Sequence, residues 1–254
     1  RNYILLTASL LFYAWGEPKY IILMLISIAV NWIFGMLIED KSDHKKLLLV
    51  LDIIFNLSLL AYFKYLDFFI TTINTLVRGN IPLRNIALPI GISFYTFQIL
   101  SYIIDLYYGE YKAQRNIMDL GLYISLFPQL IAGPIVRYTD IKEYLTNRTC
   151  TPEKTAEGVR RFIYGLAKKV IIANTVAECF KDILAIQSGS LGPGVAWMGV
   201  LLCMINMYYD FSGYSDMAIG IGKMLGFDFN ENFNYPYLSR SVTEYWQRWH
   251  ISLG

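Results

Sequence analysis

Two carboxylates and three tyrosine hydroxyls interrupt a long apolar run at residues 206–216. Asp210 and Asp216 are the carboxylates, and Tyr214 lies between them. A carboxylate at the centre of a membrane helix costs about 3 kcal/mol to insert, so such groups face a partner or a polar cavity. Six residues of helix place the two carboxylates about 240° apart around the axis, which argues against an acid/base dyad. They are expected either to tie neighbouring helices together or to line a reaction tunnel.

His250 is the second candidate for chemistry, because a neutral imidazole can take a proton from a hydroxyl near pH 7. Acyl transfer to an alcohol needs such a proton acceptor. The alternative for a lone histidine is a structural, hydrogen-bonded role. The other histidine, His44, lies in a charged loop at 39–46 and is expected to be solvated.

The segment around His250 predicts an amphipathic helix within 237–254. Ser241 and Glu244 have the spacing of a capping box that begins a helix. Glu244 and Arg248 form an i,i+4 pair of opposite charge. An aromatic-rich stripe with two tryptophans is typical of a helix at a membrane interface; its members are Val242, Tyr245, Trp246, Trp249 and Leu253.

The elements that position these residues are predicted to be membrane helices. The 254 residues are 55% hydrophobic and only 17% charged, whereas soluble domains have about 25% charged residues. Apolar runs of about 20 residues cross a hydrocarbon layer as helix. The expected fold is all-α, a polytopic transmembrane bundle with re-entrant or interfacial helices around a tunnel; its runs are Tyr3–Trp15, Tyr20–Ile38, Leu47–Phe63, Ile86–Tyr108, Ile117–Val136, Val170–Ile186 and Val195–Met224.

Proline and glycine interrupt several of these runs. Pro89 and Gly91 precede Gln98, and Pro128 lies in FPQLIAGP, residues 127–134. Broken helices at membrane depth occur where protein or a water-filled cavity satisfies the freed backbone groups, so either a packing kink or a polar cavity is expected. Gly220, Gly222 and Gly226 indicate close helix packing or a helix end.

The basic stretch Thr155–Lys169 contains an Arg-Arg and a Lys-Lys pair. It predicts either a solvated loop with a short helix or an interfacial helix that contacts anionic lipid or an anionic donor. The net charge of +2 gives no indication of a nucleic-acid partner. The three cysteines are far apart and have no ligand spacing, so no metal site is expected.

The stretch Tyr209–Gly254, YDFSGYSDMAIGIGKMLGFDFNENFNYPYLSRSVTEYWQRWHISLG, closely resembles the core signature of membrane-bound O-acyltransferases, in the branch of alginate O-acetylation membrane proteins. Further stretches that agree are LLFYAWGEPKY (10–20), LPIGISFYTFQILSYIID (88–105), FPQLIAGPIVR (127–137) and GLAKKVIIAN (165–174). The resemblance implies one transmembrane domain over residues 1–254, cut at both ends, in the plasma or inner membrane.

The resemblance also implies an enzyme that passes an acetyl group to hydroxyls of an exported, alginate-like polysaccharide or to a partner acetyltransferase. The implied partners are membrane lipid, that polysaccharide and an extracytoplasmic SGNH-type acetyltransferase. The implied acyl donor is acetyl-CoA or another acetyl thioester, with no bound cofactor. His250 matches the histidine of the family's WHISL motif, and a second family histidine in a GLWHG-like motif is expected beyond Gly254. The role of His250 stays open between proton transfer and shaping the tunnel.

Two alternatives remain at this point. The first, within the family, is D-alanyl transfer to teichoic acid, although LPIGISFYTFQ and WHISL read more like the alginate branch. The second is a transporter or channel, which would also use broken helices and buried aspartates. A transporter is less favoured, because the chain shows no evident repeated half.

Overall fold

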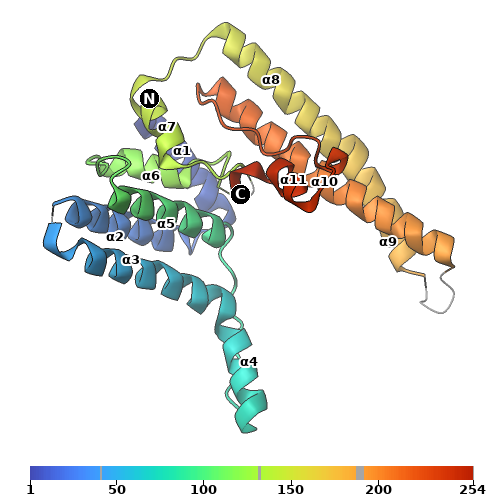
Figure 1. Cartoon of the computed structure of the whole chain (residues 1–254), viewed down its shortest axis with the longest axis horizontal. Helices are drawn as coiled ribbons and strands as arrows, with labels where there is room; N and C mark the ends of the chain where they lie inside the picture. The colour runs from blue at the N-terminus through green and yellow to red at the C-terminus, as the bar shows by residue number, and fades with distance from the viewer. Residues whose placement is uncertain (41, 131–132, 187–191, 254) are drawn as a thin grey trace. The chain divides into compact units, whose positions relative to one another are not determined.

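A computed structural model describes residues 1–40, 42–130, 133–186 and 192–253 (Figure 1). Over these ranges the chain is helical, with no strand and one isolated β-bridge between Phe233 and Trp249. The predicted all-α fold is confirmed. The chain divides into two compact units, residues 1–131 with 137–145, and residues 132–136 with 146–254.

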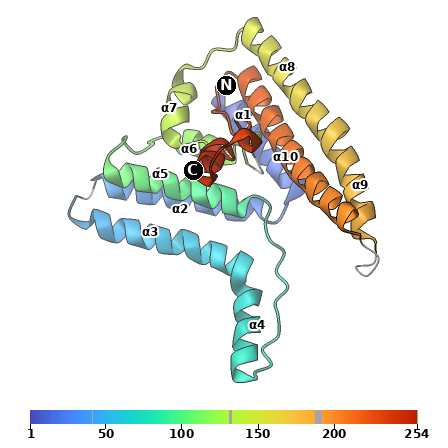
Figure 2. The same ribbon diagram turned by 45° about the vertical axis from the view of Figure 1, so that its right-hand side comes forward.

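The first unit is a stack of antiparallel helices in which α2 lies beside α3 and α5 packs against both (Figures 1 and 2). The helix α6 packs mainly on α1 and α2. The elements are α1 (Asn2–Gly16), α2 (Ile21–Asp40), α3 (Lys45–Leu60), α4 (Leu66–Val77), α5 (Ile92–Tyr108), α6 (Ile117–Ser125) and α7 (Tyr138–Asn147).

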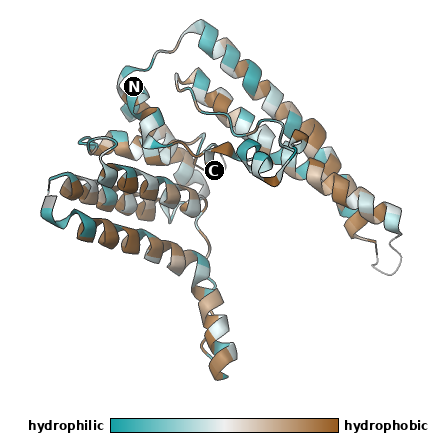
Figure 3. Cartoon of the chain, viewed as in Figure 1, coloured by the Kyte–Doolittle hydropathy of each residue, from teal (hydrophilic) through white to brown (hydrophobic). Residues whose placement is uncertain are grey.

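Among the described residues, three helices are long and apolar enough to cross a membrane: Ile21–Asp40, Lys45–Val77 and Pro193–Met224. They coincide with the predicted runs Tyr20–Ile38, Leu47–Phe63 and Val195–Met224. Figure 3 shows the apolar residues along α2 and α3. The second of these helices continues past Phe63, because a π-helical turn at Ala61–Tyr65 joins α3 to α4 without a break.

The predicted span Ile86–Tyr108 is too long, since α5 begins only at Ile92. Gly91 stands before it with a φ of 76°, in the left-handed region that glycine adopts at no steric cost. A Cβ at Gly91 would lie 2.8 Å from the carbonyl oxygen of Leu130, so the position also needs a small residue. Pro89 precedes the helix in a turn, in which its carbonyl oxygen accepts a hydrogen bond from the Ile92 amide at 3.2 Å.

The predicted span Ile117–Val136 is also too long, because α6 ends at Ser125. Gln98 and Gln129 both donate side-chain hydrogen bonds to the carbonyl oxygen of Tyr123, at 2.9 and 2.7 Å. That carbonyl lies in the last turn of α6 and has lost its helical partner. The two glutamines thus complete a helix end, and FPQLIAGP continues into residues 131–132, outside the described residues.

A buried polar cluster joins α2 to α3. Asn31 and Asn56 exchange amide hydrogen bonds at 2.9 and 3.2 Å, and both side chains are buried. Asn56 also donates to the Oδ2 atom of Asp52, one turn earlier on α3, at 3.0 Å. Because an unpaired amide in an apolar interior is unfavourable, this pair fixes the register of the two helices.

We predict that Asn56→Ala destabilises the first unit by about 1–2 kcal/mol, because it leaves the amide of Asn31 buried with one partner fewer. Thermal unfolding in detergent would measure the loss. Thr72→Ala is the control, since the exposed Thr72 hydroxyl donates to the carbonyl oxygen of Phe68 on its own helix and to no other residue that the structure describes. Equal unfolding temperatures for the two variants would contradict the assigned role of the asparagine pair.

The second unit is a long pair of antiparallel helices. The helix α8 (Pro152–Ala167) continues through a π-helical turn, Lys168–Ala173, into α9 (Asn174–Leu184). The helix α10 (Pro193–Met224) packs along all three (Figures 1 and 2). A short helix, α11 (Val242–Arg248), lies in the segment that follows α10. The predicted run Val170–Ile186 therefore begins inside the π-helical turn and continues as α9.

Glycines let α8 and α10 meet backbone to backbone. A Cβ at Gly165 would lie 2.5 Å from the carbonyl oxygen of Gly213, and one at Gly158 would lie 2.6 Å from that of Gly220. Gly213 and Gly220 are restricted in the same way by Gly165 and Gly158. This confirms the predicted close packing at Gly220, and Gly226, with a φ of 85°, follows the end of α10.

Gly165→Ala is expected to destabilise the second unit by about 1–3 kcal/mol, the range for overpacking, because backbone atoms cannot move aside as a side chain can. The matched control is Gly194→Ala in α10, where a Cβ would meet nothing within 4 Å. Alanine there should be neutral or stabilising by up to about 1 kcal/mol. Thermal unfolding of the two variants tests the close contact, and a Gly165→Ala protein as stable as Gly194→Ala would refute it.

Candidate functional site

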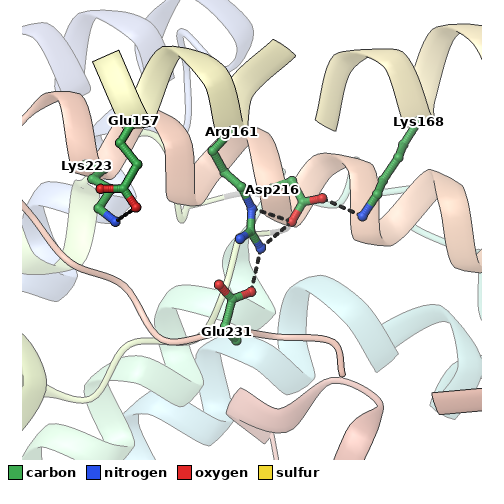
Figure 4. A network of polar contacts seen from close by, with 6 residues as sticks. All are labelled: Glu157, Arg161, Lys168, Asp216, Lys223 and Glu231. Atoms are coloured by element: carbon green, nitrogen blue, oxygen red, sulfur yellow. Dashed lines mark hydrogen bonds and ion pairs between the residues drawn. The ribbon is translucent and has the colours of Figure 1, made fainter. Parts of the chain in front are cut away.

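Asp216 is the centre of an ion-pair network between α8 and α10 (Figure 4). Its side chain is 9% exposed. The Oδ1 atom accepts hydrogen bonds from Nε and Nη2 of Arg161, at 2.9 and 2.6 Å, and Oδ2 accepts one from Nζ of Lys168 at 2.6 Å. Both oxygens of this carboxylate are therefore held by cations, and Arg161 and Lys168 are about one-third exposed.

The network extends to the segment that follows α10. Arg161 also donates to Oε2 of Glu231 at 2.5 Å, and Lys223 pairs with Glu157 at 2.5 Å (Figure 4). These pairs tie α8 to α10 and to the returning chain. Charge-assisted hydrogen bonds of this kind are the stronger ones, and they restrict the orientation of both partners.

Asp210 has a separate partner, Lys169, which donates to its Oδ1 atom. Lys168 and Lys169 both lie in the π-helical turn, where the helix is locally widened. Adjacent lysines thus serve two carboxylates six residues apart on α10. The prediction that Asp210 and Asp216 are not a dyad agrees with these separate partners.

The basic stretch Thr155–Lys169 is helical throughout, in α8 and the start of the π-helical turn. Three of its cations bind carboxylates of α10, which was not predicted from the sequence: Arg161, Lys168 and Lys169. Contact of this helix with anionic lipid or an anionic donor stays a prediction. Arg161, Lys168 and Glu231 were not predicted as site residues. The spacing of seven residues shared by the pairs Arg161/Lys168 and Gly158/Gly165 was the available signal, since it places them on one face of the helix.

The predicted start of the helix near His250 is confirmed. The Ser241 hydroxyl accepts a hydrogen bond from the Glu244 amide, as a capping residue does. The Glu244 carboxylate accepts from the Arg240 amide at 2.8 Å and pairs with Arg248 at 2.8 Å. The hydrogen bond from Arg240, followed by the nearby charge of Arg248, lowers the pKa of Glu244. These two residues thus stabilise a helix.

The predicted continuation of that helix through Leu253 is wrong, because α11 ends at Arg248. Trp249 is extended and forms the β-bridge with Phe233. His250 has a φ of 49°, in the left-handed region, so it does not lie one helical turn after Trp246. Backbone pairing with the returning segment outweighs the helical period here.

The His250 imidazole packs against an aromatic cluster through one ring, that of Phe211. It meets Phe211 of α10 edge-to-face, with centroids 4.9 Å apart, and Phe211 also contacts Phe233 and Trp249. The Nε2 atom is buried and has no hydrogen-bond partner among the described residues. Burial lowers the pKa of His250, so the ring is neutral at pH 7. A neutral imidazole with a free nitrogen is chemically able to accept a proton.

A polar cleft of about 590 Å³ lies beside this loop in the second unit. Arg161, Lys168 and Asp216 line it from the long helix pair, and Phe233 and Ile251 line it from the chain that follows α10. Phe233 pairs with Trp249, and Ile251 follows His250, so the lining includes the chain that carries the histidine. Tyr214 is half-buried on α10; Asp210, Tyr214, Glu244, Arg248 and His250 itself do not line the cleft.

The sequence profile of the membrane-bound O-acyltransferase family matches residues 112–254, which include the ion-pair network, the cleft and His250. The chain therefore belongs to this family, and it is a membrane protein with an all-α fold.

Curated relatives match all or most of the chain. It is 44% identical to the "Probable alginate O-acetylase AlgI" of Pseudomonas aeruginosa, over 100% of this chain and 50% of that protein. It is 36% identical to the peptidoglycan O-acetyltransferase of Helicobacter pylori, over 98% and 53%. It is 30% identical to the teichoic acid D-alanyltransferase of Bacillus subtilis, over 68% and 44%. The chain thus spans about half the length of these relatives.

We predict that Asp216→Asn destabilises the second unit by about 1–3 kcal/mol, because it leaves Arg161 and Lys168 without their buried counter-charge. This loss of stability is smaller than for a fully buried ion pair, because both cations are partly exposed to solvent. Asp228→Asn, which removes the more exposed pair with Lys154, should cost less than about 1 kcal/mol. Unfolding in detergent at low and high salt measures both, and equal losses would contradict the central place of Asp216.

Proposed function

We propose that the complete protein is an O-acetyltransferase of the cell membrane that passes an acetyl group to hydroxyls of an exported, alginate-like polysaccharide, directly or through a partner acetyltransferase. The observation that carries this proposal is the 44% identity to a probable alginate O-acetylase over the whole chain. The neutral, unpartnered imidazole beside a polar cleft is consistent with it. In this proposal the protein crosses the membrane more than once, as its three long apolar helices suggest.

His250 is proposed as the proton acceptor. Its Nε2 atom would take the proton of the acceptor hydroxyl while the oxygen attacks the carbonyl carbon of the acetyl thioester. The carbon–oxygen bond then forms, the carbon–sulfur bond breaks, and the proton passes to the leaving thiolate. Because burial keeps the imidazole neutral, the base is ready at pH 7.

The donor is proposed to be acetyl-CoA or another acetyl thioester that enters the polar cleft. The rings of Tyr164 and Tyr208 line the cleft, which suits a partly aromatic donor, together with Arg161 and Lys168, whose charges are shared with Asp216 and Glu231. An extracytoplasmic SGNH-type acetyltransferase is the proposed protein partner, and the polysaccharide is the proposed final acceptor. Asp210, Tyr214 and Asp216 would then support the α10 wall of the tunnel, and Glu244 and Arg248 the helix before His250.

Acetylation is favoured over D-alanyl transfer by the comparisons. The D-alanyltransferase of Bacillus subtilis matches at 30% over 68% of this chain, against 44% over all of it for the alginate relative. Cells that carry the complete gene would separate the two activities, since ester-linked acetate and ester-linked D-alanine are released by mild base and are chemically distinct.

Deletion of the complete gene is expected to abolish O-acetylation of the exported polysaccharide, measured as acetate released by mild base. His250→Asn in the complete protein should reduce it by about 10²–10⁴-fold, the usual contribution of a general base. Asparagine also tolerates the left-handed backbone at this position, so the loss reports the side chain.

His44→Ala is the matched control, since that histidine is exposed and lies in the other unit. It should leave acetate content unchanged. Unchanged acetate after deletion of the gene would refute the proposed function, whereas full activity of His250→Asn would refute only the role of the imidazole.

A further inference from the structure

The returning segment after α10 pairs with the chain on both sides of His250. The Asn234 amide donates to the carbonyl oxygen of Arg248 at 2.9 Å, before the histidine. The Ile251 amide donates to the carbonyl oxygen of Asn232 at 3.0 Å, after it. His250 therefore stands at a turn whose two flanks are fixed to one short stretch, residues 232–234.

Asn232 makes most of the contacts on the far side of this turn. Its side chain is fully buried, and its Oδ1 atom accepts hydrogen bonds from the Ser252 hydroxyl at 2.9 Å and the Ser252 amide at 3.3 Å. The Ser252 hydroxyl oxygen in turn accepts from the Ile135 amide at 3.0 Å. One asparagine thus holds two consecutive residues, Ile251 and Ser252, through its main chain and side chain together.

The backbone at His250 needs such a restraint. A non-glycine residue in the left-handed region costs roughly 1–2 kcal/mol, although histidine, asparagine and aspartate enter it more readily than most. A conformation of this kind persists where the surrounding contacts determine it. Among the residues that follow His250, Ile251 and Ser252 are held by three hydrogen bonds to Asn232.

The orientation of the Asn232 amide is also determined. A backbone N–H can only donate, so the atom facing Ser252 must be the oxygen. The Nδ2 atom consequently points away from Ser252, and it is buried without a partner among the described residues. Buried polar groups without a hydrogen-bond partner are rare in proteins. The unsatisfied nitrogen of Asn232 is therefore unusual for a purely structural residue.

We propose that Asn232 is a positioning residue for His250: its bonds to Ile251 and Ser252 hold the histidine turn in the left-handed conformation and thereby fix the imidazole against Phe211. The inference rests on the proposed function for the importance of His250, but the restraint itself is a property of the fold. Loss of the Asn232 side chain removes two of the three hydrogen bonds and lets the turn relax.

The restraint can be measured without any acetyl-transfer assay. Diethyl pyrocarbonate modifies neutral, accessible imidazoles, and mass spectrometry gives the rate at each histidine of the full-length protein in membranes. The exposed His44 serves as an internal standard for the half-buried His250. Asn232→Ala should raise the His250-to-His44 rate ratio by about fivefold, which corresponds to about 1 kcal/mol of lost restraint.

Two further variants make this result specific. Asn232→Asp keeps an oxygen that accepts from Ser252, so the rate ratio should stay near that of the wild type at an alkaline pH where the imidazole is neutral in both proteins. Its added carboxylate favours the imidazolium form of His250. In the pH profiles of the modification rate and of kcat, the acidic limb should therefore move to higher pH. Asn230→Ala is the matched control, an exposed asparagine two residues earlier on the same segment, and both readouts should match the wild type.

An unchanged His250-to-His44 ratio in Asn232→Ala would overturn the proposal. A raised ratio together with an unchanged kcat for acetyl transfer would also overturn it, because the restraint on His250 would then not contribute to catalysis. Failure of the proposed function is a different result, namely polysaccharide acetylation that survives deletion of the gene. If Asn232 had only a structural role, both Asn232 variants would be less stable. The acidic limb of the pH profile of Asn232→Asp would then lie at the same pH as in the wild type.

Discussion

The close approach of α8 and α10 is the constraint from which the rest of the second unit follows. Glycines at 158, 165, 213 and 220 let the two backbones touch, so the short side chain of Asp216 can reach cations on the neighbouring helix. Arg161 and Lys168 donate hydrogen bonds to the two oxygens of this carboxylate, and Arg161 donates a further one to Glu231. The ion pairs thus depend on the glycines, and the cleft depends on the ion pairs that form its wall.

Much of the fold follows from the sequence, because long apolar runs have few alternatives in a membrane. The spans 21–40 and 193–224 were predicted to within a few residues, and so was the start of the span 45–77, whose end lies 14 residues beyond the predicted one. The errors lie at helix ends. Gly91 begins α5 late because of a contact with Leu130, and glutamines 98 and 129 allow α6 to end early. Each of these ends depends on a residue distant in sequence, which periodicity does not reveal.

The site was predictable in part. Asp210 and Asp216 are predictable because a carboxylate in an apolar run needs a partner or a polar cavity, and His250 because an imidazole can accept a proton near pH 7. The helix cap formed by Ser241 is predictable because it depends only on neighbouring residues. The partners were missed, since nothing local connects Arg161 to Asp216, 55 residues later. The helical stripe through Trp249 was also misleading, because a bridge to Phe233 takes that residue out of the helix.

The length of α10 has a consequence for where its charges lie. Its 32 residues extend about 48 Å, whereas the hydrocarbon layer is about 30 Å thick. The half from Pro193 to Tyr209 is free of charged side chains and by itself extends about 25 Å. If that half fills the hydrocarbon, Asp210, Asp216 and Lys223 fall at the level of the lipid headgroups. The ion pairs then meet water and polar lipid at the membrane surface, and the lipid composition and ionic strength there become determinants of their strength.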